Sequence, residues 1–374
     1  MERTELSGWL RLAQAPGIGP QGARRLLAAF GPPATVFEQS AAALQAVLSP
    51  TQARALLQPA SADLSTLLDS TLAWLQAAPQ QRAVVPLGDP RYPAALLEIE
   101  DPPLLLYLMG RLDLPLDGTR SLAIVGSRNP TPQGSLNARQ FAQALAGAGL
   151  TIVSGLALGI DGAAHEGALA SPASDRLATV AVVGTGLDRV YPQRHHALAH
   201  RIAAHGLLIS EYPLGTPPLA ANFPRRNRLI AGLSSATLVV EAALQSGSLI
   251  TARLAAEQGR EVLAIPGSIH ATQSHGCHAL IRQGAKLVES AQDVLEELPA
   301  WSRPPAGLPD AGPPGAGAED RLLQALGLDP VSLDALQART GLDIATLQAR
   351  LMALELEGTV ARLPGGLLQR LVRA

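Results

Sequence analysis

The sequence predicts an α/β protein whose central domain is a doubly wound sheet, with a small helical domain before it and a winged-helix domain after it. Three observations predict this fold. Short apolar runs rich in β-branched residues alternate with helix-like stretches from about residue 82 to residue 298, which is typical of a parallel sheet covered on both faces. Residues 1–78 contain no strand-like run. A segment rich in Pro and Gly separates the central region from residues 319–374.

The composition limits the classes of protein to which the chain can belong. Its 374 residues suffice for two or three domains, and 47% hydrophobic against 16% charged residues indicates folded domains rather than disorder. The formal net charge is −2, so a nucleic-acid site has to be a local basic patch. The first five residues do not form a signal peptide, and no apolar run approaches the ~20 residues of a membrane helix. We therefore expect a cytoplasmic protein without a membrane span. The single cysteine, Cys277, excludes an intramolecular disulfide and a cysteine-based zinc finger.

Residues 1–78 are expected to fold as a small helical, SAM-like domain. Within it, residues 12–27 place a Pro-Gly-Ile-Gly turn between two helix-like stretches, which is the pattern of a helix-hairpin-helix. The amides of such a turn can hold a DNA phosphate at a helix N-terminus. The alternative is that the hairpin is only a packing unit. We favour the alternative, because the domain's five acidic and five basic residues leave no excess positive charge.

Seven apolar runs are expected to form an extended Rossmann-like sheet within residues 82–298. Nearly every run ends in Gly, Ser or Glu and then enters a loop. In doubly wound sheets ligands bind at the carboxyl ends of the strands, and the unusual residues of this chain gather there. The seven runs are Leu122–Gly126, Leu150–Gly155, Thr179–Gly184, Gly206–Glu211, Ala236–Glu241, Glu261–Gly267 and Lys286–Glu289.

The C-terminal part is expected to be a linker followed by a winged helix. Residues 299–318 hold six Pro and four Gly. In residues 319–374, Ser332 and Asp343 can cap two helices, and Pro364-Gly365-Gly366 predicts a hairpin. The second helix, residues 343–357, carries three acidic residues and one Arg, a poor surface for the major groove of DNA. We therefore expect this domain to contact protein or to serve the fold rather than to read a DNA sequence.

One short run, residues 222–233, is the strongest candidate for a ligand site. It places a Phe, three Arg and two Asn within seven residues, and Arg is almost never buried without a partner. Arg can contact two phosphate oxygens at once, and Phe offers a face on which a base can stack. We expect Phe223 to stack on a base and four arginines to contact phosphates: Arg128, Arg225, Arg226 and Arg228.

Loops at predicted strand ends frame this run. Gly126-Ser127-Arg128 can bring amides, a hydroxyl and a guanidinium to one phosphate. A glycine-rich loop at residues 154–162 follows the next strand, and Ser246-Gly247-Ser248 opens a helix, where it can bind an anion or simply cap the helix. Together these residues predict a pocket for a phosphodiester chain. The predicted DNA-binding residues are Gly126, Ser127, Arg128, Gly155, Gly159, Asn222, Phe223, Arg225, Arg226, Asn227, Arg228, Ser246, Gly247 and Ser248.

The sequence assigns no residue to catalysis, to a metal ion or to a cofactor. Walker A and dinucleotide-binding patterns are missing. Asp161 and His165 can be drawn as a carboxylate–imidazole pair, but we favour a helix cap and a histidine packed beneath the glycine-rich loop. The histidines at 195–205 and 275–278 are of a type used in zinc sites, but their spacing is not a zinc pattern.

Two tyrosines are further candidates for base stacking. Tyr191 and Tyr212 each precede a proline in a predicted strand-end loop, as Phe223 does. Either ring can stack on a base. The alternative, in which the tyrosines anchor their loops by packing on proline, fits the sequence equally well.

Taken in order, these patterns closely resemble the DNA-processing protein A (DprA/Smf) family of natural transformation. The resemblance covers roughly residues 82–298, and the flanking domains fit the family's three-domain layout less specifically. His278 departs from the family, which often has Asn there. The matching segments are Val125-Gly126-Ser127-Arg128, Ser154-Gly155 through Ala164-His165, Gly184 through Asp188 with Tyr191-Pro192, Ser210 through Pro213, Phe223 through Arg228, Glu241 with Ser246 through Ser248, and Ile265-Pro266-Gly267.

The resemblance implies an extended Rossmann domain that binds single-stranded DNA and forms a homodimer. It also implies that the protein displaces single-strand-binding protein, protects incoming DNA and loads the RecA recombinase onto it. Two other classes remain open. The fold also resembles phosphoribohydrolases that cleave nucleoside monophosphates, although their Pro-Gly-Gly-x-Gly-Thr loop is absent. The third class is a winged-helix regulator that senses a nucleotide, and the acidic second helix argues against it.

Overall fold

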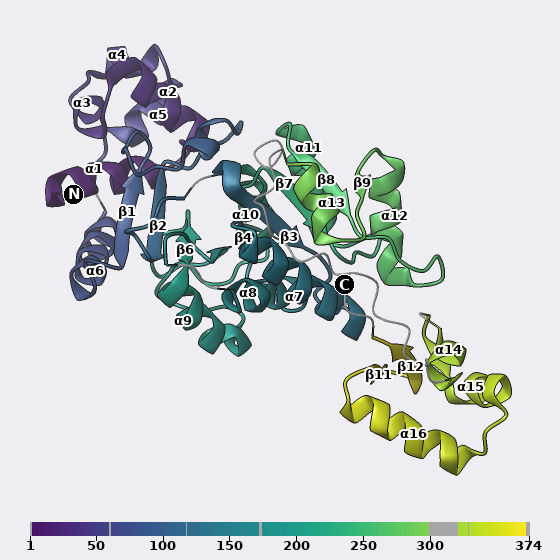
Figure 1. Ribbon diagram of the computed structural model, residues 1–374. Helices are drawn as coiled ribbons and strands as arrows, with labels where there is room; N and C mark the ends of the chain where they lie inside the picture. The colour runs from purple at the N-terminus through teal and green to yellow at the C-terminus, as the bar shows by residue number, and fades with distance from the viewer. Residues whose placement is uncertain are drawn as a thin grey trace.

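A mixed sheet forms the centre of the protein in the computed structural model, which describes residues 2–59, 61–116, 118–171, 174–298, 321–327 and 329–371. Within these residues the sheet has nine strands in the order β1-β2-β6-β5-β4-β3-β7-β8-β9 (Figure 1). The predicted linker, residues 299–318, lies outside the described residues, as do residues 319 and 320.

Seven parallel strands correspond to the seven runs predicted from the sequence. Six of these strands are shorter than the predicted runs, because the Gly, Ser and Glu residues at the carboxyl ends mostly belong to the loops, and β3 has the predicted length. In the middle of the sheet, Leu122 pairs with Ile152 on one side and with Ala236 on the other. The doubly wound, Rossmann-like prediction is confirmed. The strands are β3 (Ser121–Val125), β4 (Thr151–Ser154), β5 (Thr179–Val182), β6 (Leu207–Ser210), β7 (Ala236–Val239), β8 (Glu261–Ala264) and β9 (Lys286–Leu287).

Two antiparallel strands extend the sheet and were not predicted. β1 (Arg82–Pro86) pairs antiparallel with β2 (Leu105–Gly110), and β2 pairs antiparallel with β6. The β2 segment, Leu-Leu-Tyr-Leu-Met-Gly, contains no β-branched residue, so its composition does not distinguish a strand from a short helix. The prediction of a wholly parallel sheet was wrong at this edge.

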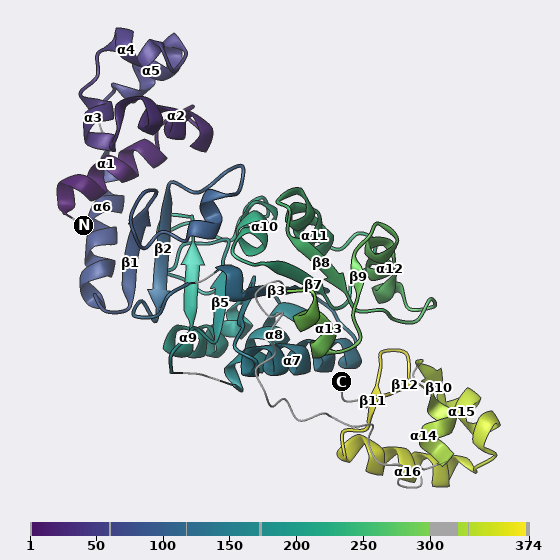
Figure 2. The ribbon, with the colours of Figure 1, turned by 45° about the horizontal axis from the view of Figure 1, so that its top comes forward.

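The chain reverses its winding direction between β3 and β7. From β3 the strands proceed through β4 and β5 to β6 on one side, and β7, β8 and β9 are added on the other side of β3. Helices α10 (Asn222–Gly232), α11 (Ser248–Glu257) and α12 (His275–Arg282) cover one face. The opposite face carries α7 (Pro132–Gly147), α8 (Ile160–Leu169), α9 (His196–His205) and α13 (Ala291–Glu296) (Figure 2). The crevice at this switch point is where doubly wound sheets bind ligands.

The N-terminal helices form a lobe beside the β1 edge of the sheet (Figure 1). The turn predicted at residues 16–19 connects the first two helices, as expected for a helical hairpin, and Ile18 of the turn is buried between them and the helices that follow. The lobe is not detached from the sheet, since the Trp74 ring lies 6.1 Å from the Tyr107 ring in β2. The helices are α1 (Arg3–Ala13), α2 (Pro20–Phe30), α3 (Pro33–Phe37), α4 (Ala41–Gln45), α5 (Pro50–Leu56) and α6 (Ala62–Ala77).

The C-terminal residues fold as a separate winged-helix lobe (Figures 1 and 2). Ser332 and Asp343 cap their helices through their side chains, and Gly341 adopts a left-handed conformation (φ 67°) that ends the first of them. A three-stranded sheet in the order β10-β12-β11 completes the wing. The elements are α14 (Arg321–Leu326), β10 (Val331–Ser332), α15 (Leu333–Thr340), α16 (Ile344–Leu356), β11 (Val360–Arg362) and β12 (Leu367–Arg370).

Among the residues that the structure describes, four short 3-10 helices lie in the loops: η1 (Ala94–Leu97), η2 (Gly118–Arg120), η3 (Gln193–His195) and η4 (Thr272–Ser274). Across the described part of the chain, no helix combines the length and the apolar character needed to cross a membrane.

Candidate nucleic-acid interface

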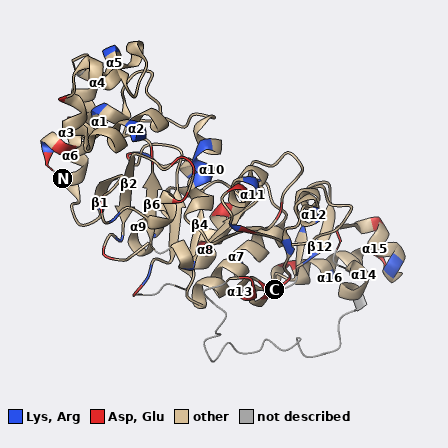
Figure 3. Cartoon of the chain, turned by 90° about the horizontal axis from the view of Figure 1, so that it is seen from above, with Lys and Arg blue, Asp and Glu red and all other residues tan. Residues whose placement is uncertain are grey.

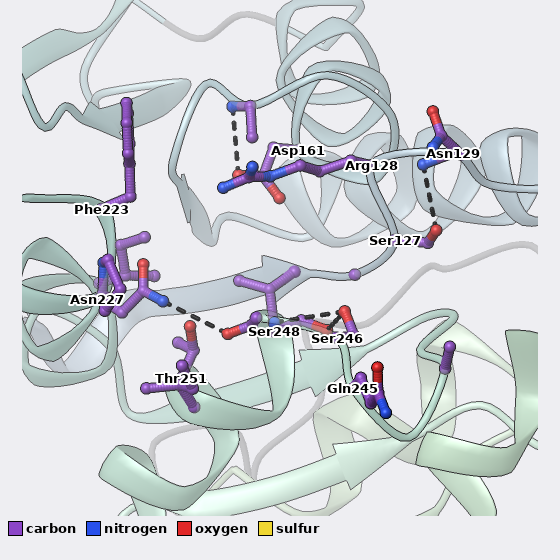
Figure 4. Close-up of a pocket in the computed structure, with 18 of the residues that line it drawn as sticks. Ser127, Arg128, Asn129, Asp161, Phe223, Asn227, Gln245, Ser246, Ser248 and Thr251 are labelled. Carbon is purple, nitrogen blue, oxygen red and sulfur yellow. Dashed lines mark hydrogen bonds between the residues drawn. The ribbon is translucent and has the colours of Figure 1, made fainter. Parts of the chain in front are cut away.

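A cavity of about 460 Å³ lies at the switch point, between the loops that follow β3 and β7 (Figure 4). The N-terminal half of α10 and the start of α11 form its other walls. Nine of the fourteen predicted site residues line this cavity, and five do not: Gly155, Gly159, Asn222, Arg225 and Arg228. The strand-end pocket expected from the sequence is therefore present, with a smaller set of residues.

The loop after β3 is held close to the end of β7. The amide of Ser127 donates to the carbonyl of Glu241 at 2.7 Å, and its hydroxyl accepts from the amide of Asn129 at 3.1 Å. A Cβ atom at Gly126 would lie 2.7 Å from the side chain of Ile160, so only glycine fits this approach. The loop directs Arg128 outward, and Figure 4 shows its side chain reaching across the pocket toward Phe223. The Arg128 guanidinium carbon lies 5.9 Å from the centre of that ring.

The glycine-rich loop after β4 is organised by Asp161. One carboxylate oxygen of Asp161 accepts from the amides of Gly155 (3.1 Å) and Ala157 (3.3 Å). We expected Asp161 to cap α8, but the N-cap is Gly159 and no side chain caps that helix. The carboxylate instead joins the glycine-rich loop to the first turn of α8. Burial raises the pKa of Asp161, while the nearby Arg226 and the two amides counteract that rise.

Gly159 supports the pocket without lining it. Its φ of 83° is the left-handed region that favours glycine, and a Cβ atom there would collide with the carbonyl oxygen of Ser127. The amide of Ile160 donates to this same carbonyl at 3.1 Å. The loops after β3 and β4 are therefore packed against each other, and Gly159 shapes the loop that carries Arg128.

Arg226 lies in the interior, contrary to our expectation that it contacts phosphate. Only 3% of the residue is exposed, and its guanidinium donates to the carbonyls of Gly155 (2.6 Å) and Val182. Burial lowers the pKa of Arg226 to about 10, against the opposing effect of Asp161, so it remains charged at neutral pH. The side chain joins α10 to the carboxyl ends of β4 and β5, and we assign it a positioning role.

Arg228 is also engaged by protein groups. It forms an ion pair with Glu211, and its Nε lies 3.7 Å from Asp101. Asp101 also binds Arg24 of α2, so a chain of charges connects the helical hairpin to α10. Burial raises the pKa of Glu211, and Arg228 counteracts that rise. Our expectation of a direct phosphate contact by Arg228 is not supported, because both acidic partners already neutralise it.

Arg128 and Arg225 are the two exposed arginines of the predicted set. Neither has an acidic partner within 4 Å among the described residues. Arg128 lines the pocket, whereas Arg225 lies on α10 outside it. Figure 3 shows the basic residues of α10 near the middle of the molecule, with acidic residues close beside them. The basic patch that a nearly neutral protein needs for nucleic acid is thus small and local.

Phe223 and Asn222 begin α10 and have different environments. Asn222 is buried and its amide donates to the carbonyl of Gly184 at 3.0 Å, so it fixes the helix rather than contacting a ligand. Phe223 is half-buried and its ring packs over Gly184, where a Cβ atom would come within 3.1 Å. The ring of Tyr191 lies 5.5 Å away at an interplanar angle of 37°.

The loop before α11 supplies hydroxyl groups and a backbone turn to the pocket. The hydroxyls of Ser246 and Ser248 lie 2.7 Å apart, and Asn227 donates to the carbonyl of Gly247 at 3.4 Å. No atom lies within 4 Å of a Cβ built on Gly247, so this side of the pocket is open. An anion can approach the first amides of α11 here.

Glu241 faces away from a ligand. Its carboxylate accepts from the amide (2.9 Å) and the hydroxyl (2.5 Å) of Thr131 at the start of α7. Burial raises the pKa of Glu241 against these hydrogen bonds. The residue connects β7 to the first turn of α7 and leaves no free carboxylate to repel phosphate.

His165 is a packed core residue. Its Nδ1 lies 2.7 Å from the hydroxyl of Thr179, which itself donates to the carbonyl of Ile152. Nδ1 must therefore be the donor, which leaves Nε2 as the unprotonated nitrogen of a neutral ring. Burial lowers the pKa of His165 to about 3, with smaller contributions from His195 and Arg226.

The histidine groups do not gather ligands for a metal. The ring centres of His196 and His200 lie 4.5 Å apart at an interplanar angle of 56°, and those of His275 and His278 lie 6.4 Å apart. Within the described ranges, no three His, Cys, Asp or Glu residues are placed to hold an ion together. Cys277 is buried.

Several pocket residues were missed at the sequence level. Asn129 follows the predicted Arg128 directly and could have been included from its position. Thr251 follows Ser248 by three residues in α11 and therefore lies on the same face of the helix. Gln245 and Gln273 come from loops with no motif, and Gln273 donates to the carbonyl of Asn129 at 3.0 Å. Nothing in the local sequence indicates that contact.

Comparison with known families matches most of the chain. The family of DNA recombination-mediator protein A matches residues 83–299, and the DprA winged helix domain matches residues 304–366. Protein Smf of Escherichia coli is 42% identical over 312 residues, which cover 80% of this chain and 80% of that protein. DNA processing protein DprA of Streptococcus pneumoniae is 50% identical over 210 residues, which cover 56% of this chain and 72% of that protein.

Two solved structures agree with these matches. The X-ray structure of Streptococcus pneumoniae DprA superimposes with a TM-score of 0.66 at 37% identity, covering 80% of this chain and 98% of that one. A structure of the Helicobacter pylori protein, which describes its single-stranded DNA binding mode, has a TM-score of 0.51 at 33% identity and covers 57% of this chain and 94% of that one. The resemblance stated from the motifs is confirmed. The chain belongs to the DNA recombination-mediator protein A (DprA) family.

Proposed function

We propose that the protein binds single-stranded DNA in the switch-point pocket as a recombination mediator. The observation that carries the proposal is the exposed Arg128 beside the ring of Phe223 in this pocket, with no acidic partner among the residues that the structure describes. A guanidinium for phosphate and a ring for a base are the two groups that single-strand binding needs. The Helicobacter pylori relative, whose single-stranded DNA binding has been described, supports the same ligand here.

The pocket favours a single strand over a duplex. Stacking on Phe223 requires a base that is free of its partner, and a cavity of about 460 Å³ is far smaller than a DNA helix. Glycines and serines at two loops let a sugar-phosphate chain approach the backbone closely. Arg226, Glu241 and Asp161 hold the walls of the pocket in place rather than contacting the strand.

Membership of the DprA family supports a proposal for the biological role. We propose that the protein protects incoming single-stranded DNA in natural transformation, displaces single-strand-binding protein and loads RecA recombinase onto the strand. We propose that the protein carries out this role in the cytoplasm, as we expected from the sequence. The direct test is RecA-promoted strand exchange on DNA already coated with single-strand-binding protein. Addition of this protein should relieve the inhibition, and an unchanged rate would contradict the loading role.

A homodimer through the Rossmann-like domain is part of this proposal. A groove of about 790 Å³ runs between α11 and α12, with Leu249, Ile250 and Leu280 in its lining and Leu244 exposed beside it. The neighbouring β9 is the last strand of the described sheet, so its outer edge is unpaired. A second copy of the chain can cover both features. Light scattering should give about twice the 38.8 kDa of one chain, and a monomer at micromolar concentration would contradict the dimer.

DNA affinity at matched salt concentrations tests the ligand class. The protein should bind an unstructured single strand more tightly than a duplex of the same length, and affinity should fall with salt as phosphate contacts release counterions. Equal affinity for both forms, or preference for the duplex, would contradict the proposal.

We also propose that the protein is not an enzyme. The two carboxylates nearest the pocket, Asp161 and Glu241, are both occupied by backbone amides or by Thr131. The purified protein should hydrolyse neither ATP nor nucleoside monophosphates. Turnover that disappears in an Asp161→Asn or Glu241→Gln variant would instead support the phosphoribohydrolase alternative.

A further inference from the structure

Tyr191 presents a second aromatic ring at the rim of the DNA pocket. It is 47% exposed, and its ring centre lies 5.5 Å from that of Phe223. We propose that a bound single strand leaves the pocket over Tyr191, stacks a further base on this ring and continues toward Arg194. This inference rests on the proposed single-strand binding and adds a stacking residue and a direction for the strand.

The loop that carries Tyr191 is anchored by another residue. Nδ1 of His195 donates to the carbonyl of Leu156 at 3.0 Å, which ties η3 to the glycine-rich loop after β4. The contact is close, because a Cβ atom on Gly162 would lie 2.7 Å from the His195 ring. Since His195 fixes the loop, the fold does not need Tyr191 as an anchor.

The other three tyrosines of the described chain are held in place by burial or by hydrogen bonds of their hydroxyls. The hydroxyl of Tyr92 donates to the carbonyl of Pro103 at 2.8 Å, and that of Tyr212 donates to the carbonyl of Asn222 at 3.2 Å. Tyr107 is fully buried against Trp74. Tyr191 differs from all three because its ring is half exposed, and it differs from Tyr92 and Tyr212 also because its hydroxyl has no hydrogen-bond partner among the described residues. A rigidly held, exposed ring is suited to stacking on a base.

The groups around Tyr191 define where the strand goes next. Phe223 lines the pocket and contacts both Arg128 and Tyr191, whereas Tyr191 is not part of the lining, so a strand that passes Arg128 meets Phe223 before Tyr191. Arg194 follows three residues later in η3 and is exposed without an acidic partner in the described chain. Arg189 is less available, because it pairs with Asp188 at 2.9 Å. A base on Tyr191 and a phosphate on Arg194 together extend the site by one or two nucleotides.

The test measures the affinity of the wild type and of two variants at Tyr191 for a short and a longer oligothymidine. Tyr191→Leu should weaken binding of a strand long enough to reach the rim by about 5- to 150-fold, the range that ~1–3 kcal/mol per stacked base corresponds to. The same variant should bind the shortest strand that fills the pocket as wild type does. Tyr191→Phe keeps the ring and should bind both strands normally, and Arg194→Ala should affect only the longer strand.

Each outcome decides between the alternatives. If Tyr191→Leu loses affinity equally for both strand lengths, Tyr191 only supports Phe223. If it loses no affinity for the longer strand, Tyr191 does not lie on the path of the DNA. Either result overturns the inference. If Arg128→Ala fails to weaken even the short strand, the proposed pocket itself is wrong.

A second variant keeps the inference testable if Tyr191→Leu is unstable. Tyr191→Trp places a fluorophore at the rim of the pocket. The native tryptophans of the described chain, Trp9 and Trp74, are buried in the N-terminal helices. Stacking should quench the added fluorescence on the longer strand only, after subtraction of the wild-type signal. No quenching at saturating DNA overturns the inference.

Discussion

Arg225 and Arg226 are neighbours in the sequence, but only one of them is available to a ligand. The cluster of arginines predicted a phosphate site because Arg is rarely buried alone. Arg226 is buried with partners that the sequence does not reveal, the carbonyls at the ends of β4 and β5. Helical spacing places adjacent residues 100° apart, so a helix with one face on the sheet directs one of the two arginines inward. Residue types alone could not show which one.

Arg226→Ala should destabilise the central domain by roughly 3–5 kcal/mol, because it leaves Asp161 and two carbonyls without their buried partner. Urea unfolding at pH 7 measures this loss. Arg225→Ala is the matched control on the same helix, and its stability should stay within ~0.5 kcal/mol of wild type because the side chain is exposed. Equal stability of the two variants would contradict the positioning role of Arg226.

His165 makes the stability of the central domain depend on pH. The folded protein protonates this ring only near pH 3, whereas the unfolded chain does so near pH 6.5. Acid therefore favours the unfolded chain, and the contribution of neutral His165 is lost as the pH falls from about 6.5 toward 3. From pH 7 to pH 5 the free energy of unfolding should drop by about 2 kcal/mol through this residue.

Urea unfolding of wild type and His165→Gln at the two pH values isolates that contribution. The substitution lowers stability at both pH values. The decrease in the free energy of unfolding from pH 7 to pH 5 should nevertheless be smaller by about 2 kcal/mol in the variant than in wild type. The same drop in both proteins would mean that His165 is already protonated or that its pKa is not lowered.

At the scale of elements, strands were easier to predict than the contacts between loops. The β-branched runs from β3 to β8 are buried on both faces, so their composition identifies them. β2 was missed because it is made mostly of Leu, Tyr and Met, and its partner β1 is an edge strand that ends in a proline. The position of the pocket followed from strand ends alone, since parallel strands share one carboxyl edge. Its detailed wall, including Gln273, depends on loop conformations that leave no periodic pattern.

Gly159→Ala tests whether the loops after β3 and β4 act as one unit. The added methyl would collide with the carbonyl of Ser127, and the alanine would have to adopt a φ of 83°. The loop that carries Arg128 therefore has to shift. We expect at least a tenfold loss of single-strand affinity, about 1.4 kcal/mol. Gly284→Ala is the control, because its φ is 103° but no atom lies within 4 Å of the added carbon. Equal binding by both variants would contradict coupling between the two loops.

At the scale of the whole molecule, the two flanking lobes relate differently to the DNA pocket. The helical hairpin is connected to α10 through Arg24, Asp101 and Arg228. The winged helix carries six Arg against seven Asp and Glu in residues 319–374, and its α16 has no excess of basic residues. A nearly neutral lobe can release few counterions from DNA. We therefore propose that the central domain binds DNA and that the winged helix serves partner-dependent steps.

A chain truncated after residue 299 should keep the affinity of the full chain for single-stranded DNA. We expect single-strand binding within about threefold of the full chain, roughly 0.6 kcal/mol. Recombinase loading on coated DNA should be reduced by more than binding is. Abolished binding in the shortened chain, or tight binding by residues 319–374 alone, would contradict this division of roles.

The central claim, that a single strand lies across Arg128 in the switch-point pocket, is tested most directly by the salt dependence of binding. Arg128→Ala should weaken binding to all sequences by a similar factor and lower the slope of log affinity against log salt by ~0.7, the value for one lost phosphate contact on a single strand. Arg282→Ala, which removes an exposed arginine from α12, should leave affinity and slope unchanged. A slope for Arg128→Ala identical to that of wild type would place the DNA elsewhere on the protein.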